Sequence, residues 1–129
     1  MRLLLDTHTL IWWLNGAGKK LSIRATKAIA DRNNQVFVSA VSAWEIGTKV
    51  VLQKLPEAAG VPANFDALIN EHSFAHLALA YNHALRSADY GASNRDPFDR
   101  MLAAQAELED LTLVSVDEKL AAFPCRVLW

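Results

Sequence analysis

The sequence predicts an α/β fold in which a mainly parallel sheet of four to five strands carries helices on both faces. Short apolar runs alternate with longer segments of helical periodicity along the whole chain. The first run, residues 3–5, is apolar without alternation, which is typical of a strand covered on both faces. No repeat, low-complexity tract or long linker interrupts residues 1–129, so we expect a single domain.

Composition narrows the class of protein. The chain has 129 residues, 52% hydrophobic and 21% charged, as expected for a globular domain with a substantial core. No apolar run is long enough to span a bilayer, and Asp6 interrupts the first one, so we expect neither a membrane partner nor a signal peptide. The single cysteine, Cys125, excludes an internal disulfide and a cysteine-based zinc site, and it suits the cytoplasm. The net charge of −1 does not favour nucleic-acid binding by bulk positive charge.

Each element follows from a local pattern. The predicted strands cover residues 3–5, 36–39, 74–79, 111–116 and 126–129. The predicted helices cover residues 8–15, 22–32, 40–54, 64–71, 81–90, 96–109 and 117–123. Ser22 is expected to cap its helix, and Asp96 followed by Pro97 is a typical helix start. Gly16 and Gly18 should end the first helix, residues 56–62 form a break, and residues 91–95 form a loop.

Four acids occupy corresponding places around the predicted sheet. Asp6 and Asp117 directly follow strands, whereas Glu45 and Asp99 lie in the first turns of helices. Because the carboxyl ends of parallel strands share one edge of a sheet, we expect these four side chains to converge there.

Each acid also has a purely local interpretation. Asp6 and Asp117 could cap the helices that follow them, and the negative charge of Asp99 could interact favourably with the dipole of its helix. Glu45 could pair with Lys49 on an exposed helix face. Asp96, close to Asp99, is interpreted first as a cap and only second as a site residue.

Carboxylates gathered in one cleft repel one another, and a hard divalent cation such as Mg²⁺ or Mn²⁺ relieves that repulsion. None of the four histidines forms a pair with zinc-ligand spacing, and only His8 is near Asp6. The chemistry that suits such a cluster is metal-assisted hydrolysis of a phosphodiester, with one or two metal ions. Arg95 and Arg100 flank the acids of residues 96–99, where they could orient a phosphate or pair with neighbouring acids.

Four stretches of the chain, taken together, resemble a known family. They are Leu4-Leu5-Asp6-Thr7-His8, then Val38-Ser39 with Ser42-Ala43-Trp44-Glu45-Ile46, then residues 95–106 beginning Arg-Asp-Pro-Phe-Asp-Arg, and finally Leu113-Val114-Ser115-Val116-Asp117. In this order they resemble a PIN domain, specifically a VapC-type toxin ribonuclease of a type II toxin–antitoxin system. The resemblance covers the whole chain and implies the three-layer PIN fold over residues 1–129. Where the family often has Asn two positions after the first Asp, this chain has His8.

The resemblance implies an Mg²⁺-dependent endoribonuclease, a hydrolase in which Mn²⁺ can substitute for the metal. Its catalytic, metal-binding residues would be Asp6, Glu45, Asp99 and Asp117. Asp96 is the added acid of the Asp-Pro-Phe-Asp subgroup, and Arg100 is a further auxiliary candidate. Thr7 and Ser115 would hydrogen-bond the carboxylates or waters around the metal.

The same resemblance implies three partners: an RNA substrate, a second copy of the chain in a homodimer, and a cognate VapB-type antitoxin whose tail obstructs the site. Trp12, Trp13 and Trp44 are of the residue type enriched in interfaces. Adjacent helical positions cannot share one face, so we expect at least one of Trp12 and Trp13 in the core.

Three alternatives differ in chemistry. A phosphoaspartate enzyme usually has a second Asp two residues after its nucleophile, where this chain has His8. A receiver-like signalling module would need an Asp at the end of a middle strand, where this chain has Ser39. A PIN fold that only binds its partners would have lost acids, and none is lost here. Loss of RNA cleavage in Asp6→Asn or Asp99→Asn would separate these possibilities.

Overall fold

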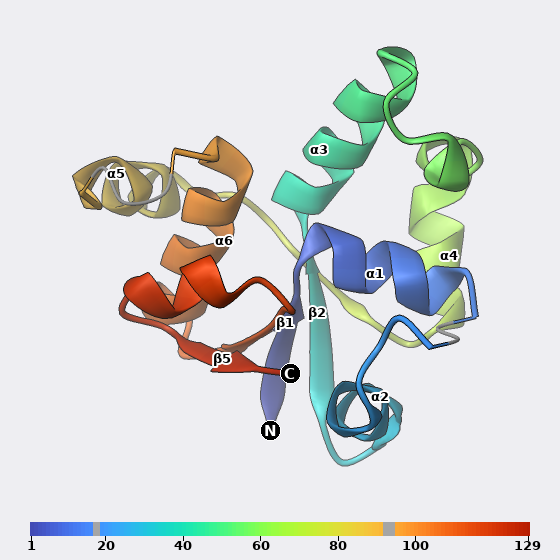
Figure 1. Ribbon diagram of the computed structural model, residues 1–129, viewed down its shortest axis with the longest axis horizontal. Helices are drawn as coiled ribbons and strands as arrows, with labels where there is room; N and C mark the ends of the chain where they lie inside the picture. The colour runs from blue at the N-terminus through green and yellow to red at the C-terminus, as the bar shows by residue number, and fades with distance from the viewer. Residues whose placement is uncertain (17–18, 92–94) are drawn as a thin grey trace.

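Five strands form the central sheet, and every pairing between neighbours is parallel. The computed structural model describes residues 1–16, 19–91 and 95–129 and is shown in Figure 1. The strands are β1 (Arg2–Leu5), β2 (Gln35–Ser39), β3 (Ala75–Leu77), β4 (Thr112–Val114) and β5 (Arg126–Leu128). Helices cover both faces of this sheet, so the predicted α/β class, parallel sheet and strand number are confirmed.

The strand order, β3-β2-β1-β4-β5, puts the first strand in the middle. Leu3 pairs in register with Val36 of β2 on one side and with Thr112 of β4 on the other. The chain therefore builds outward from β1 through β2 to β3, then returns to the opposite side of β1. Such a reversal leaves a crevice at the carboxyl ends of the two strands that flank it, here β1 and β4, where α/β proteins bind ligands.

Alternate residues of β1 supply two separate cores. Leu3 and Leu5 pack in a cluster with residues of α1 (Thr7–Leu14), α2 (Ile23–Ala30) and α4 (Phe65–Glu71). Leu4 points to the opposite face and packs with α6 (Pro97–Leu108), which lies beside α5 (Tyr81–Asp89). All three leucines are fully buried, as expected for a strand covered on both faces.

Helix α3 (Ala40–Val51) rises from the carboxyl end of β2 and extends beyond the sheet (Figure 1). Its first turns contact both cores, through Val41 on one side and Ile46 on the other. Its last turn is solvated, because Val51 is 81% exposed. The helix therefore presents its N-terminal half, which includes Glu45, to the edge of the sheet.

Several predicted boundaries shift in the structure. Helix α3 ends at Val51 rather than residue 54, and Gln53 takes a left-handed φ of 57°. The predicted strand over 74–79 shortens to Ala75–Leu77. Two short 3₁₀ helices, η1 (Pro56–Ala58) and η2 (Pro62–Asn64), occupy the predicted break, and a third, η3 (Glu118–Ala122), replaces the last predicted helix. Of the predicted stops and loops, Gly18 and residues 92–94 lie outside the described residues.

Two further expectations can be compared with the described part of the chain. None of its helices is both long and apolar enough to cross a membrane. Trp12 and Trp13 are both partly buried against the core that contains Leu3, whereas Trp44 is 50% exposed.

Candidate active site

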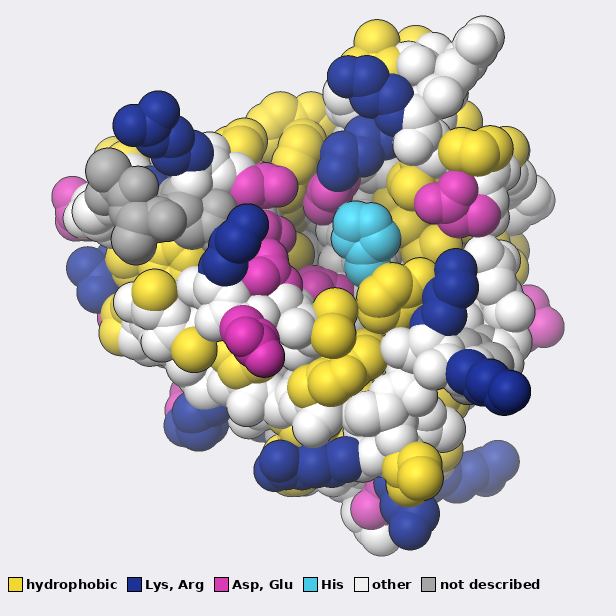
Figure 2. Space-filling model, viewed as in Figure 1, with side chains coloured by type: hydrophobic (Ala, Val, Ile, Leu, Met, Phe, Trp, Pro, Cys, Tyr) yellow, Lys and Arg dark blue, Asp and Glu magenta, His cyan; other side chains and the backbone are white. Residues whose placement is uncertain are grey.

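A cleft of about 310 Å³ opens at the carboxyl edge of the sheet, where the strand order reverses. Its lining consists of Asp6, Thr7, His8, Trp12, Glu45, Lys49, Asp96, Asp99, Val116 and Asp117. Figure 2 shows this face, on which Asp and Glu side chains gather around a hollow next to a histidine. The structure therefore brings the four predicted acids and Asp96 together from four separate segments of the chain.

Asp6 directly follows β1, caps α1 and lines the cleft. Its Oδ1 accepts a hydrogen bond from the backbone N–H of Thr9 at 2.8 Å, and the residue is only 7% exposed. Burial raises the pKa of the Asp6 carboxyl, although hydrogen bonds from Ser115 and Thr9 act in the opposite direction. A cation bound in the cleft would stabilise the ionised carboxylate at this position.

Glu45 is the second buried acid, at 4% exposure. Lys49, one turn later on α3, places its Nζ 2.5 Å from Glu45 Oε2. The pair predicted at this spacing is therefore present, but Glu45 faces the cleft rather than an exposed helix surface.

Asp96 and Asp99 come from the start of α6. Asp96 caps this helix by accepting hydrogen bonds from the backbone N–H groups of Phe98 at 2.9 Å and Asp99 at 3.3 Å. Pro97 occupies the first turn, as the sequence predicts. Asp99 lies in the same turn, so the cap also fixes the direction in which the start of α6 meets the cleft.

Asp117 follows β4 and caps η3, with Oδ1 accepting from the Lys119 N–H at 3.0 Å. Ser115, two residues earlier and only 2% exposed, accepts from the Asp117 N–H at 3.0 Å through its Oγ. The Ser115 hydroxyl also lies close enough to Asp6 to lower the pKa of that carboxyl, against the effect of burial. Ser115 therefore lies beside both acids, the one that follows β1 and the one that follows β4.

Thr7 lines the cleft as well, and its Oγ1 lies 3.1 Å from the hydroxyl of Ser42 on α3. Thr9, on the next turn of α1, donates through its hydroxyl to the Val114 carbonyl at 3.0 Å. These contacts join α1 to α3 and to β4, and they hold the two sides of the cleft in place. The sequence does not predict this role for Thr9 or Ser42. The only indication is that each is a small polar residue within an otherwise apolar segment.

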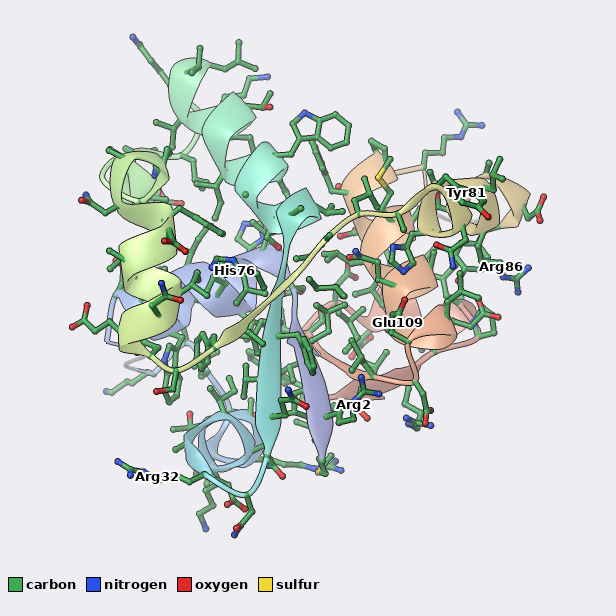
Figure 3. The ribbon with its side chains drawn as sticks, turned by 180° about the vertical axis from the view of Figure 1, so that it is seen from behind. Arg2, Arg32, His76, Tyr81, Arg86 and Glu109 are labelled. Atoms are coloured by element: carbon green, nitrogen blue, oxygen red, sulfur yellow. The ribbon has the colours of Figure 1, made fainter. Side chains whose placement is uncertain are left out.

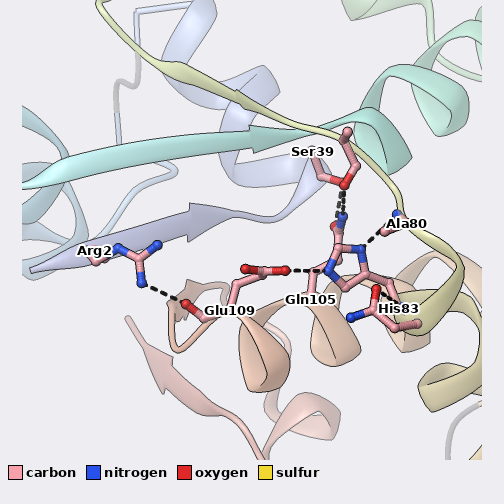
Figure 4. Close-up of polar contacts among 8 residues, drawn as sticks. Arg2, Ser39, Ala80, His83, Gln105 and Glu109 are labelled. Carbon is pink, nitrogen blue, oxygen red and sulfur yellow. Dashed lines mark hydrogen bonds and ion pairs between the residues drawn. The ribbon is translucent and has the colours of Figure 1, made fainter.

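A second buried polar pair fixes α6 against the sheet (Figure 4). The Ser39 hydroxyl, at the end of β2, donates to Gln105 Oε1 at 2.5 Å. Gln105 is fully buried, and its amide donates to the Ala78 carbonyl at 3.3 Å. This pair carries no cleft chemistry, but it sets the position of the helix that begins with Asp96 and Asp99.

Arg100 contacts the backbone at the end of α5. Its guanidinium donates to the carbonyls of Ser87 at 2.9 Å and Gly91 at 2.7 Å, and to that of Tyr90. It is not among the residues that line the cleft. Through these hydrogen bonds Arg100 connects α6 to the C-terminal end of α5. Arg95 is exposed just before α6.

The donor atoms of the cleft fit a hard cation. Five carboxylates supply oxygen ligands, and His8 is the only residue in the lining with a nitrogen ligand of the kind zinc prefers. Within the described residues, no three Asp, Glu, His or Cys side chains are close enough together to enclose an ion by themselves. Mg²⁺ does not require such a cage, because it is usually held by one or two carboxylates together with waters and substrate phosphates.

Comparison with known proteins agrees with this architecture. Residues 3–124 match the model of the PIN domain family. DNA-bound VapBC from Salmonella typhimurium superposes with a TM-score of 0.69 at 17% identity, over 99% of this chain and 97% of the other. VapBC2 from Rickettsia felis, bound to a promoter DNA fragment, superposes with a TM-score of 0.66 at 15% identity, over 100% of this chain and 99% of the other. FitAcB from Neisseria gonorrhoeae superposes with a TM-score of 0.64 at 18% identity, over 98% of this chain and 96% of the other.

At these identities the structural likenesses concern the fold alone. No curated protein matches the sequence. The family model, however, spans nearly the whole chain and includes all five carboxylates of the cleft. The chain therefore belongs to the PIN domain family.

Proposed function

We propose that this protein is the VapC-type toxin of a type II toxin–antitoxin system and that it is a metal-dependent endoribonuclease. One observation carries the proposal: five carboxylates from four segments of a PIN domain line one cleft at the reversal of strand order. Such a set of oxygen ligands suits Mg²⁺, with Mn²⁺ as a substitute.

In this proposal Asp6, Glu45, Asp99 and Asp117 form the metal site, where one or two carboxylates would bind the ion directly and the others would bind it through waters. A bound Mg²⁺ would lower the pKa of a coordinated water and neutralise charge on the scissile phosphate. The chain prepares the site for this chemistry by fixing its carboxylates. Asp6, for example, is oriented by the Thr9 N–H and the Ser115 hydroxyl before any ligand binds.

The partners are proposed on separate grounds. The structurally similar proteins include VapBC and FitAB assemblies, some bound to DNA, which supports a VapB-type antitoxin as the partner of this chain. Exposed apolar side chains suit contacts with that antitoxin or with a second copy in a homodimer. They include Tyr81, which is 82% exposed and lies on α5 as seen from behind in Figure 3. A cytoplasmic location would keep the Cys125 thiol reduced.

The test is RNA cleavage by protein freed of any antitoxin. We expect cleavage in Mg²⁺, none after chelation, and a loss on the order of 100-fold or more in Asp6→Asn and in Asp99→Asn. Asn keeps the capping ability of Asp6, so the fold should be retained. Asp66→Asn, an exposed acid on α4 outside the cleft, is the matched control and should cleave normally.

Equal cleavage by the wild type, Asp6→Asn and Asp99→Asn would overturn the proposal. Absence of cleavage together with a phosphoryl group retained on Asp6 would instead support the phosphoaspartate alternative.

A further inference from the structure

Lys49 is a cation built into an otherwise acidic cleft. Among the described residues of the lining, it alone is Lys or Arg, and it faces five carboxylates. Its side chain is 31% exposed, so Lys49 is partly accessible to solvent.

The ammonium group is directed at one particular acid. Lys49 Nζ lies 2.5 Å from Glu45 Oε2, and the Glu45 side chain is only 6% exposed. Because both residues belong to α3 at i, i+4 spacing, the helix itself fixes their separation. The same Nζ lies 5.8 Å from the centre of the Phe98 ring, next to Asp99 in sequence. Lys49 is thus held between α3 and the start of α6.

We propose that Lys49 is a resident counter-ion of the cleft, which holds the Glu45 carboxylate and competes with the divalent cation for it. This inference rests on the metal cleft of the proposed function. A buried carboxylate is costly without an opposite charge close by, and Lys49 supplies that charge from the chain itself. A divalent cation that binds at Glu45 must either displace the ammonium group or tolerate its repulsion at short range.

Two consequences follow. Lys49 keeps the protein stable with its acids ionised when no divalent cation is bound, and it weakens the binding of that cation. Lys49 is accordingly a positioning residue that acts through Glu45, and removal of its charge should change metal affinity and stability in opposite directions.

Mn²⁺ affinity, measured by titration calorimetry without RNA, tests whether Lys49 weakens the binding of the divalent cation. Lys49→Met keeps the length of the stem and removes the charge, and we expect it to bind Mn²⁺ about tenfold more tightly or better. Lys49→Arg keeps the charge and should bind like the wild type. If Lys49→Met binds Mn²⁺ equally or more weakly, the proposal is overturned, because Lys49 would then hold Glu45 in place for the metal.

Thermal unfolding, with a matched control, tests whether Lys49 stabilises the protein when no divalent cation is bound. Arg86 on α5 pairs with Glu107 at 2.8 Å, is 35% exposed and lies outside the cleft (Figure 3). We expect Lys49→Met to melt below the wild type in chelator and to gain more from Mn²⁺ than the wild type does. Arg86→Met should melt lower in both conditions by the same amount. Equal gains from Mn²⁺ in Lys49→Met and Arg86→Met would overturn the proposal.

The same titration distinguishes a failure of this inference from a failure of the proposed function. Asp6→Asn should bind Mn²⁺ far more weakly than the wild type. If Asp6→Asn binds Mn²⁺ as well as the wild type does, the proposed metal site is wrong whatever the result for Lys49→Met. The counter-ion role of Lys49 is then wrong as well.

Discussion

The Asp6 carboxylate accepts the Thr9 N–H at 2.8 Å and Asp6 also lines the acidic cleft, so one residue both caps a helix and faces the candidate site. The two interpretations that its sequence position allows are therefore compatible. The same holds for Asp117, which caps η3 from the cleft. Capping by a backbone N–H restrains the rotamer of each acid while one carboxylate oxygen stays available to the cleft.

Asp6→Asn should stabilise the protein at neutral pH when divalent cations are removed. Burial raises the pKa of the folded Asp6 carboxyl above its unfolded value of about 3.9. Its protonated form therefore stabilises the fold at low pH, and that contribution is lost as pH rises through the folded pKa. Asn keeps the cap and carries no charge. The melting-temperature difference between variant and wild type should grow in favour of the variant from pH 3 to pH 7, and a variant that melts lower at pH 7 would contradict this account.

Substitutions at Asp96 separate its capping role from metal binding. Its carboxylate accepts two backbone hydrogen bonds at the start of α6. Asp96→Ala should lose about 1 kcal/mol of unfolding free energy, whereas Asp96→Asn should lose only a few tenths. If Asp96 is chiefly a cap, Asp96→Asn also cleaves RNA within a few-fold of the wild-type rate. A 100-fold loss of cleavage at unchanged stability would make Asp96 a ligand. Denaturant unfolding and cleavage rates on the same preparations measure both quantities.

Gln105→Ala should be among the most destabilising polar substitutions. It removes the partner of the buried Ser39 hydroxyl and of the Ala78 carbonyl, and it leaves a void under α6. We expect a loss of about 2–4 kcal/mol in urea unfolding, the sum of unpaired polar groups and a cavity. Gln35→Ala, at an exposed end of β2, should change stability by no more than about 0.5 kcal/mol. Similar losses at the two positions would show that the Ser39–Gln105 pair contributes little.

Cys125 should be a slow thiol in the folded protein. Burial raises its pKa to about 11, so little thiolate exists at pH 8. Reaction with a thiol-specific reagent at pH 8 should be at least about tenfold slower in the native protein than in denaturant. Equal rates in the two conditions would show that the thiol is more exposed than the structure places it.

Local patterns predicted the approximate place of each strand, the caps of α2 and α6, and the acids that line the cleft. The apolar run 3–5 is covered on both faces because β1 is central, and Ser22 caps α2 by accepting the Ala25 N–H at 3.0 Å. The convergence of the acids at one cleft could be predicted because the carboxyl ends of parallel strands share one edge of the sheet, whatever the order of the strands.

What the sequence could not predict depends on contacts between distant segments. Ser39 and Gln105 are 66 residues apart, and nothing local identifies them as partners. The spacing of Glu45 and Lys49 predicts a pair, but the burial of Glu45 arises only when α1 and α6 close around α3. For Arg100 the sequence suggests a phosphate contact or pairing with a neighbouring acid, and neither suggestion includes its contacts with the carbonyls at the end of α5.

The central claim is that the carboxylates of one cleft act together on RNA, and a double-mutant cycle on Asp6 and Asp99 tests it most directly. The measurement is the Mg²⁺-dependent cleavage rate of the wild type, Asp6→Asn, Asp99→Asn and the double variant, each shown to be folded. If both acids serve one metal centre, each single variant loses on the order of 100-fold or more, and the double variant is no more than a few-fold slower than the worse single one. Single variants that keep the wild-type rate, or losses that multiply in the double variant, would contradict the account.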